Sequence, residues 1–187
     1  MSDARRPVNE MLEGRENVYL LATSRIRMRS SMENLDVGDV HFEKLAEGET
    51  VNVPRWVAEE LIAQGFGESL DAPFETEIFS ALGKEKMMGP LQLSGLPQDF
   101  YVKMRRRLAL LAKSVADGKS RREDLERLRA VCYDLVGIRL SKLLSLSSSS
   151  APASSLAEKL TPEESAFFAL SQSLAKEWKA GLLGGGK

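Results

Sequence analysis

The chain has few of the residues that build catalytic and metal sites. Its 187 residues include one cysteine, Cys132, and one histidine, His41. A single thiol excludes an intrachain disulfide and a cysteine-based zinc cage, which usually takes two to four thiolates. His41 has no second histidine with which to complete a metal triad or a proton relay. We therefore expect no metal and no cofactor, with Cys132 a small core residue and His41 structural or exposed.

Phosphate-binding loops and catalytic pairs are missing as well. The chain contains neither a GxxxxGK[ST] loop nor a GxGxxG fingerprint. The adjacent acids Glu59 with Glu60, and Glu163 with Glu164, fall on predicted helix surfaces or helix starts, where solvation and the helix dipole account for them. No spacing predicts a pocket with converging polar groups, so the chain is not expected to be an enzyme.

Long hydrophobic runs are also lacking. No stretch approaches the roughly 20 apolar residues of a membrane span, and Met1 to Arg6 lack the apolar run of a secretory signal. Hydrophobic residues make up 43% of the chain and charged residues 28%, as in an ordinary globular protein with a core. We expect a cytoplasmic protein without membrane contact.

The charge is nearly balanced in total but uneven along the chain. The net charge is −1, yet the segment from Lys103 to Lys142 has 12 Lys or Arg against 5 Asp or Glu. Met1 to Val102 has 10 basic and 18 acidic residues. An acidic and a basic module on one chain favour electrostatic contact with other chains, or with nucleic acid through the basic part.

The first half of the chain has the short alternating patterns of a small β-rich unit. Residues 1–17 show no sustained period and are expected to form an N-terminal arm or a short irregular helix. Strands are predicted at Val18 to Ala22, at Arg25 to Arg29, at Val37 to Leu45 and around Val51 and Val53. The turn at Glu47 and Gly48 predicts that the last two of these strands pair as a hairpin.

Two short helices are predicted after these strands. The first opens at Pro54, whose fixed φ suits a first turn, and ends near Gln64, with Gly65 as a left-handed cap. The second follows Pro73 and carries Phe74, Ile78, Phe79 and Leu82 at helical spacing, before residues 83–90 break the chain.

Longer helical periods begin at Phe100. The first predicted helix ends at Asp117 and Gly118, and the next begins with a capping box of Ser120 and Glu123 and reaches about Leu144. Residues 145–155 are too rich in serine to pack and are expected to form a loop. A last helix starts at Thr161, Pro162 and Glu164 and buries Phe167, Phe168, Leu170, Leu174 and Trp178.

These patterns predict an α+β chain with two domains. An N-terminal arm at residues 1–17 precedes a small β-rich domain with short helices at residues 18–89. A mostly α-helical bundle domain with the serine-rich loop follows at residues 90–187.

The helix faces exceed what three helices can easily hide, which predicts that other subunits cover the remainder. The predicted subunit interface consists of Phe100, Tyr101, Met104, Leu108, Leu111, Leu125, Leu128 and Leu135. Because Trp and Arg are enriched at interface hot spots, Arg55, Trp56 and Phe66 are candidates for docking a partner. Trp56 is slightly favoured as a core residue, and Phe66 as the exposed anchor.

Clustered arginines leave a second function open, nonspecific DNA binding by a basic helical face. The candidate phosphate contacts are Arg105, Arg106, Arg107, Arg121 and Arg122. Consecutive arginines do not share one helix face, so partner carboxylates or solvent are at least as good an expectation for them.

Several segments together resemble a GINS subunit, a component of the archaeal and eukaryotic replicative helicase assembly. VNVPRWVAEELIAQG at Val51 to Gly65 resembles the small B domain of that family, and DFYVKMRRRLALL at Asp99 to Leu111 the start of its helical A domain. DLERLRAVCYDLVGIRLSKLLSLS at Asp124 to Ser147 is similar to the long A-domain helix, and LTPEESAFFALSQSL at Leu160 to Leu174 to the final one.

The resemblance implies a noncatalytic scaffold for DNA replication. A small domain before the helical one is similar to one archaeal class, although the R-x-x-K spacing of Arg139 and Lys142 and the T-P-E-E start at Thr161 also resemble the class of reversed order. The family implies a heterotetramer with GINS subunits of reversed domain order. Its implied partners are the MCM helicase and a RecJ-like or Cdc45-like protein, with polymerase or primase contacts possible and DNA contact weak or indirect.

Overall fold

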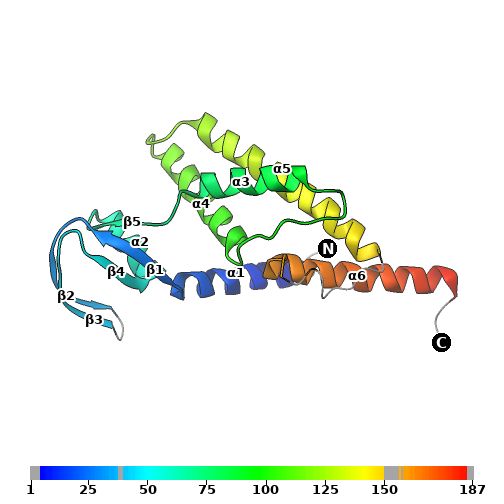
Figure 1. The fold of residues 1–187 in the computed structure, drawn as a ribbon, viewed down its shortest axis with the longest axis horizontal. Coiled ribbons are helices and arrows are strands. Elements are labelled where there is room, and N and C mark those ends of the chain that lie inside the picture. The colour runs from blue at the N-terminus through cyan, green and yellow to red at the C-terminus, as the bar shows by residue number, and fades with distance from the viewer. Residues whose placement is uncertain (1–4, 38–39, 150–155, 157, 185–187) are drawn as a thin grey trace. The chain divides into compact units, whose positions relative to one another are not determined.

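The computed structural model describes residues 5–37, 40–149, 156 and 158–184, and it divides the chain into two compact units. Unit 1 spans Met1–Ala72 and unit 2 spans Pro73–Lys187. Figure 1 shows strands in the first and long helices in the second, so the predicted α+β class with strands before helices is confirmed. The sequence patterns predict the boundary between residues 89 and 90. The structure joins the helix of residues 74–87 to the helical unit instead, because that helix packs on the longest helix of unit 2.

Unit 1 is built around a three-stranded antiparallel sheet in the order β4-β1-β5, with β1 in the centre. A separate hairpin pairs β2 with β3. The elements are α1 (Arg5–Leu21), β1 (Thr23–Met28), β2 (Met32–Val37), β3 (Val40–Leu45), β4 (Thr50–Pro54), α2 (Arg55–Ala63) and β5 (Gly67–Ser69).

The core of unit 1 follows from the alternation of β1 and β4. Ile26 and Met28 of β1 and Val51 and Val53 of β4 are buried on one face, as period two requires. Helix α2 packs Val57, Ala58 and Leu61 into the same cluster. Gly65 ends that helical turn at φ +84°, which confirms the predicted left-handed cap.

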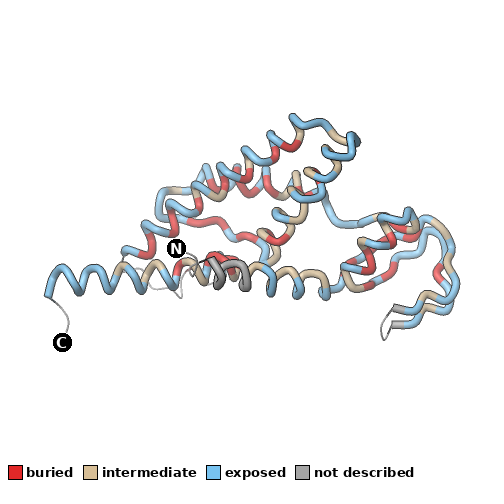
Figure 2. Tube along the Cα trace, turned by 180° about the vertical axis from the view of Figure 1, so that it is seen from behind, coloured by how far each residue is buried: buried red, intermediate tan, exposed pale blue. Residues whose placement is uncertain are grey.

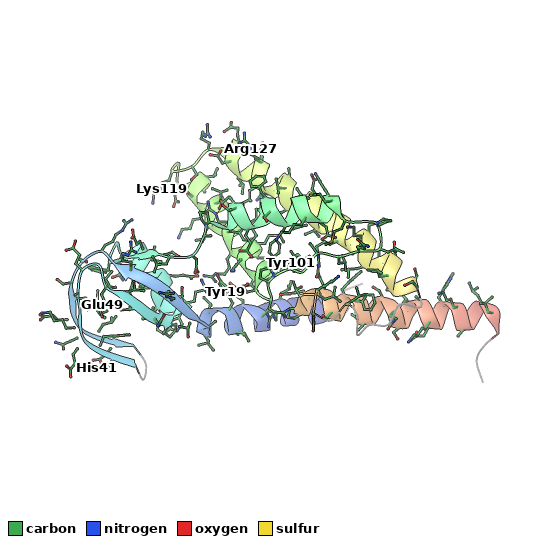
Figure 3. The ribbon with its side chains drawn as sticks, in the orientation of Figure 1. Tyr19, His41, Glu49, Tyr101, Lys119 and Arg127 are labelled. Atoms are coloured by element: carbon green, nitrogen blue, oxygen red, sulfur yellow. The ribbon has the colours of Figure 1, made fainter. Side chains whose placement is uncertain are left out.

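Two strand predictions in unit 1 are wrong. Residues 18–21 belong to α1, which also takes in most of the predicted arm; the Arg55 guanidinium stacks 4.3 Å from the Tyr19 ring centre. The predicted hairpin between residues 37–45 and β4 does not form, because β4 pairs with β1, placing Val51 opposite Ile26, while β3 pairs with β2. His41, labelled in Figure 3, lies exposed on the β2–β3 hairpin. Its ring contacts the Asp36 carboxylate.

Unit 2 consists of helices around two apolar clusters. Its elements are α3 (Phe74–Met87), α4 (Phe100–Ala116), α5 (Arg122–Ser148) and α6 (Pro162–Leu183). The larger cluster joins α3, α4 and α5 around Phe100 and Leu135, both fully buried. The smaller one joins the α3–α4 connection, the end of α5 and the start of α6 around Leu93, Leu143 and Phe168. Figure 2 shows the buried stretches of these helices.

Two helices extend further than predicted, at places where contacts with other elements stabilise the additional turns. Helix α3 continues through Gly83 to Met87, and α5 runs four residues past Leu144 into the serines, to Ser148. Leu146 and Ser147 are buried there, and the Ser145 hydroxyl donates to the Ser141 carbonyl oxygen at 3.0 Å. The rest of the predicted serine-rich loop, residues 150–155, lies outside the described residues.

The predicted start of α6 forms as a capping box, whereas the capping box predicted for α5 does not form. Thr161 accepts from the Glu164 amide at 3.3 Å and its own amide donates to the Glu164 carboxylate at 3.2 Å, so the start of α6 is confirmed. Helix α5 begins after Arg121 without a side-chain cap, and the Ser120 hydroxyl instead bonds the Ser114 hydroxyl at 2.6 Å.

Replacing Thr161 with alanine tests the cap at α6. The change removes the acceptor for the Glu164 amide, so we expect unit 2 to lose about 1 kcal/mol of its free energy of unfolding. Thr161→Ser keeps the hydroxyl and serves as the control. Urea unfolding followed by circular dichroism measures both, and equal stability of the alanine variant and the parent would contradict the role of the cap.

Candidate subunit interface

A buried cluster of charges fixes the start of α6 against the rest of unit 2. Arg139 of α5 is fully buried and forms a two-pronged pair with Glu164 of α6, with Nη2 at 2.7 Å from Oε2. Its Nη1 donates at 2.9 Å to Glu85 Oε2 of α3 and at 2.9 Å to the Ser94 carbonyl oxygen. One guanidinium therefore connects α3, α5, α6 and the α3–α4 connection.

Two further donors complete this cluster. Lys142, one turn after Arg139, donates at 2.8 Å to Glu85 Oε1 and at 2.9 Å to the Glu85 carbonyl oxygen. The Tyr101 hydroxyl of α4 donates at 2.7 Å to Glu164 Oε1 (Figure 3 labels Tyr101). The carboxylates of Glu85 and Glu164 thus face the cations of Arg139 and Lys142, and Tyr101 connects α4 to the same network.

The pKa values in the network favour an ionised Glu85 and a protonated Tyr101. Burial raises the pKa of Glu85, but hydrogen bonds from Lys142 and Ser94 outweigh it and leave that pKa below its ordinary value. Burial and the carboxylate of Glu164 raise the pKa of Tyr101, which stays protonated and donates. We therefore assign the network to positioning helices, because buried ion pairs of this kind specify geometry more than they stabilise.

Three residues of the network were already noted in the sequence, as part of the family resemblance and not as an ion-pair network. Arg139, Lys142 and Glu164 belong to the R-x-x-K and T-P-E-E patterns of the family resemblance, but their contact with each other and with Glu85 was not foreseen. The sequence feature that could have indicated this network is the position of Arg139 along its helix. Arg139 falls four residues after Leu135 on the apolar face of α5, where an unpaired charge would be costly.

Few of the described residues of unit 2 cover the second half of α6. Every residue from Lys176 to Gly184 is exposed. Leu170, Leu174, Trp178 and Leu182 follow one another at intervals of four and expose 70%, 67%, 67% and 66% of their surface. We call these four residues the α6 stripe. A helix end this short is marginal in water, and large apolar side chains at helical spacing mark a contact surface.

Three residues that the sequence expected to be buried on the last helix are therefore exposed. Leu170, Leu174 and Trp178 belong to the α6 stripe, and Phe168 is the member of that expected set that is buried. The spacing correctly predicted an apolar face, but the described residues leave that face open from Leu170 onward. The end of α5 still contacts α6 on another side, where Lys179 donates to the Ser148 carbonyl oxygen at 2.8 Å.

The eight residues predicted for the subunit interface lie mostly inside unit 2. Phe100, Leu111, Leu125, Leu128 and Leu135 are buried in its larger cluster. Tyr101, Met104 and Leu108 are partly buried against that cluster. The structure thus brings the set together, but as core, and the exposed apolar surface lies on other residues.

The three candidate docking residues divide differently from expectation. Trp56 is 46% exposed, although the sequence slightly favoured it as core. Phe66, the expected exposed anchor, is partly buried against the unit 1 core. Arg55 is half-buried and donates to Asp71 at 2.9 Å. Trp56 is therefore the member of this set that presents an apolar surface.

Three of the five candidate DNA-contacting arginines pair with carboxylates of their own chain. Arg107 Nη2 lies 2.6 Å from Glu75 Oε1. Arg121 pairs with Asp124 at 3.0 Å, and Arg122 with Glu126 at 2.9 Å. Arg105 and Arg106 also make interactions within the chain. This pairing does not favour the DNA-binding alternative.

Among the described residues, no group of three or more His, Cys, Asp or Glu is placed to hold a metal ion. Across the same residues, each helix is too short or too polar to cross a membrane. Cys132 is buried, and burial raises the pKa of its thiol to about 11, which confirms it as a core residue.

Comparison with known proteins identifies unit 2. The family model described as the GINS complex protein helical bundle domain, Sld5, matches residues 73–183. This range coincides closely with the four helices α3 to α6. No curated protein matches the chain.

Proposed function

Because this chain belongs to the GINS family of DNA replication complex subunits, we propose that it is a noncatalytic scaffold of the replicative helicase assembly and joins its sister subunits through the α6 stripe. The uncovered second half of α6 is the observation that carries this proposal. Burying a large apolar side chain stabilises by about 1.5–3 kcal/mol. Exposed ion pairs contribute about 0–1 kcal/mol, so apolar packing dominates assembly.

The proposed assembly is a heterotetramer of the archaeal type, with subunits of reversed domain order. The order of the two units, β-rich before helical, supports this class. The MCM helicase and a RecJ-like or Cdc45-like protein are the proposed further partners, with polymerase or primase next to them. Exposed Trp56 of unit 1 supports a role for that unit in docking them.

Replacing Trp178 with aspartate tests the assembly surface. Trp178 lies 67% exposed, so the variant should fold as the parent does. A carboxylate at the centre of an apolar interface should cost at least about 2 kcal/mol of binding, or roughly 30-fold in affinity. Light scattering with size-exclusion chromatography of the chain mixed with a reversed-order GINS subunit measures the effect.

Ala180→Asp provides the matched control. It adds the same carboxylate two residues further along, on the opposite side of α6, and should leave assembly intact. If Trp178→Asp assembles as tightly as the parent, or if both variants weaken assembly equally, the α6 stripe is not the joining surface.

A further inference from the structure

Unit 2 has a second apolar surface, a groove between α4 and α5 that the α6 stripe does not include. The groove has a volume of about 300 Å³. Its lining residues are Met104 and Leu108 of α4, and Arg129, Cys132, Tyr133 and Val136 of α5. A space of this size accepts one or two large side chains, which is the scale of an interface anchor and small for a cofactor.

The groove continues along α5 as a line of exposed apolar residues. Tyr133 is 77% exposed, and Leu140 and Leu144, seven and eleven residues further on, are 42% and 48% exposed. Offsets of seven and four keep these side chains on one side of a helix. The line from Tyr133 to Leu144 is about 16 Å long at 1.5 Å per residue, which equals three turns of a helix lying along it.

The composition of the groove is that of a binding hot spot. Tyr and Arg are enriched where binding energy concentrates, and Tyr133 and Arg129 both line this space. Met104 supplies an adaptable apolar side chain. The remaining lining residues are apolar, so the groove can bind apolar side chains of a partner by burying them.

The positive charge beside the groove indicates which charge a binding partner would carry. Arg129 is the charged residue of the lining, and α4 has five Lys or Arg and no acidic residue. Lys103 and Arg107 of α4 already face Glu77 and Glu75 of α3. Arg129 is exposed, so a carboxylate beside an apolar anchor would complement it.

From these observations we propose that the α4–α5 groove binds an acidic amphipathic helix of a partner protein. Large apolar residues of that helix, spaced three and four apart, occupy the groove and the line from Tyr133 to Leu144. Carboxylates on its flank face Arg129. The lining of this site shares no residue with the α6 stripe.

The test uses two synthetic peptides and the full chain. Both peptides are 18-residue helices with one apolar face of Leu and Phe; one carries Glu at its flanking positions and its twin carries Lys. We expect the Glu peptide to bind and to shift the ¹³C signal of the Met104 methyl group in NMR, and the Lys peptide to bind at least about fivefold more weakly. Binding of the Glu peptide should weaken as salt rises.

Matched variants locate the site. Tyr133→Asp should abolish binding of the Glu peptide, and Arg129→Glu should reverse the preference between the peptides; both residues are exposed, so the fold is kept. Trp178→Asp should leave peptide binding unchanged, which separates this site from the assembly surface. Failure of both peptides to bind, equal binding of both, or a dimer of the chain that Tyr133→Asp dissolves would overturn the proposal.

Discussion

Replacing Arg139 with alanine should destabilise unit 2 by about 3–5 kcal/mol, the cost of removing one partner from a buried ion pair. The guanidinium serves both Glu85 and Glu164 and is fully buried. Without it, Glu164 keeps the Tyr101 hydroxyl and Glu85 keeps Lys142, but one positive charge then faces two buried carboxylates. Urea unfolding followed by circular dichroism at 222 nm gives the free energy.

A second measurement localises the effect. Hydrogen exchange should show protection lost across α5 and the start of α6, while the amides of β1 stay protected because unit 1 has its own core. Arg139→Lys keeps the charge but loses the planar fork that holds Glu164, so its loss should be intermediate. A loss of less than about 1 kcal/mol for alanine would show that the network contributes little.

The second large effect is expected at Leu128, where aspartate should unfold unit 2. Leu128 is 4% exposed within the cluster of α3, α4 and α5. Removing a buried leucine costs about 2–5 kcal/mol, and burying an unpaired carboxylate adds several more. Together these costs reach the range of the whole stability of an ordinary domain, about 5–15 kcal/mol. Thermal unfolding by circular dichroism should show the helical signal lost at ordinary temperature.

Leu174→Asp is the matched comparison. It introduces the same carboxylate in place of the same leucine, at a position 67% exposed on α6, and should leave the helical signal close to that of the parent. The pair separates core from surface. If Leu128→Asp folded normally and only dissociated an assembly, Leu128 would be an interface residue after all.

Local patterns predicted most elements of the fold but not their partners. The period of α4 and the Thr161 to Glu164 start of α6 depend on neighbouring residues, and both were predicted. The pairing of β4 with β1 could not be predicted, because several strands share the same alternation of apolar and polar residues and any of them could pair with β4. The extension of α3 to Met87 depends on Glu85 meeting Arg139, which lies far along the chain.

The exposed apolar surface was harder to predict for a related reason. An apolar period shows that one side of a helix is buried, and it does not show which chain buries it. Leu128 and Leu174 have equivalent side chains at regular spacing, yet one is enclosed by α3 and α4 and the other is open. The packing of α3 and α4 against Leu128 separates the two positions, and an apolar period along one helix does not predict which other helices will cover it.

The bare end of α6 has a consequence for the life of the protein in the cell. If the α6 stripe joins sister subunits, as proposed, a copy made in excess of them keeps Trp178 in water. Local opening of an exposed helix end offers the backbone to proteases, and exposed apolar surface is recognised by chaperones. We therefore expect copies without partners to be cleared faster than assembled ones.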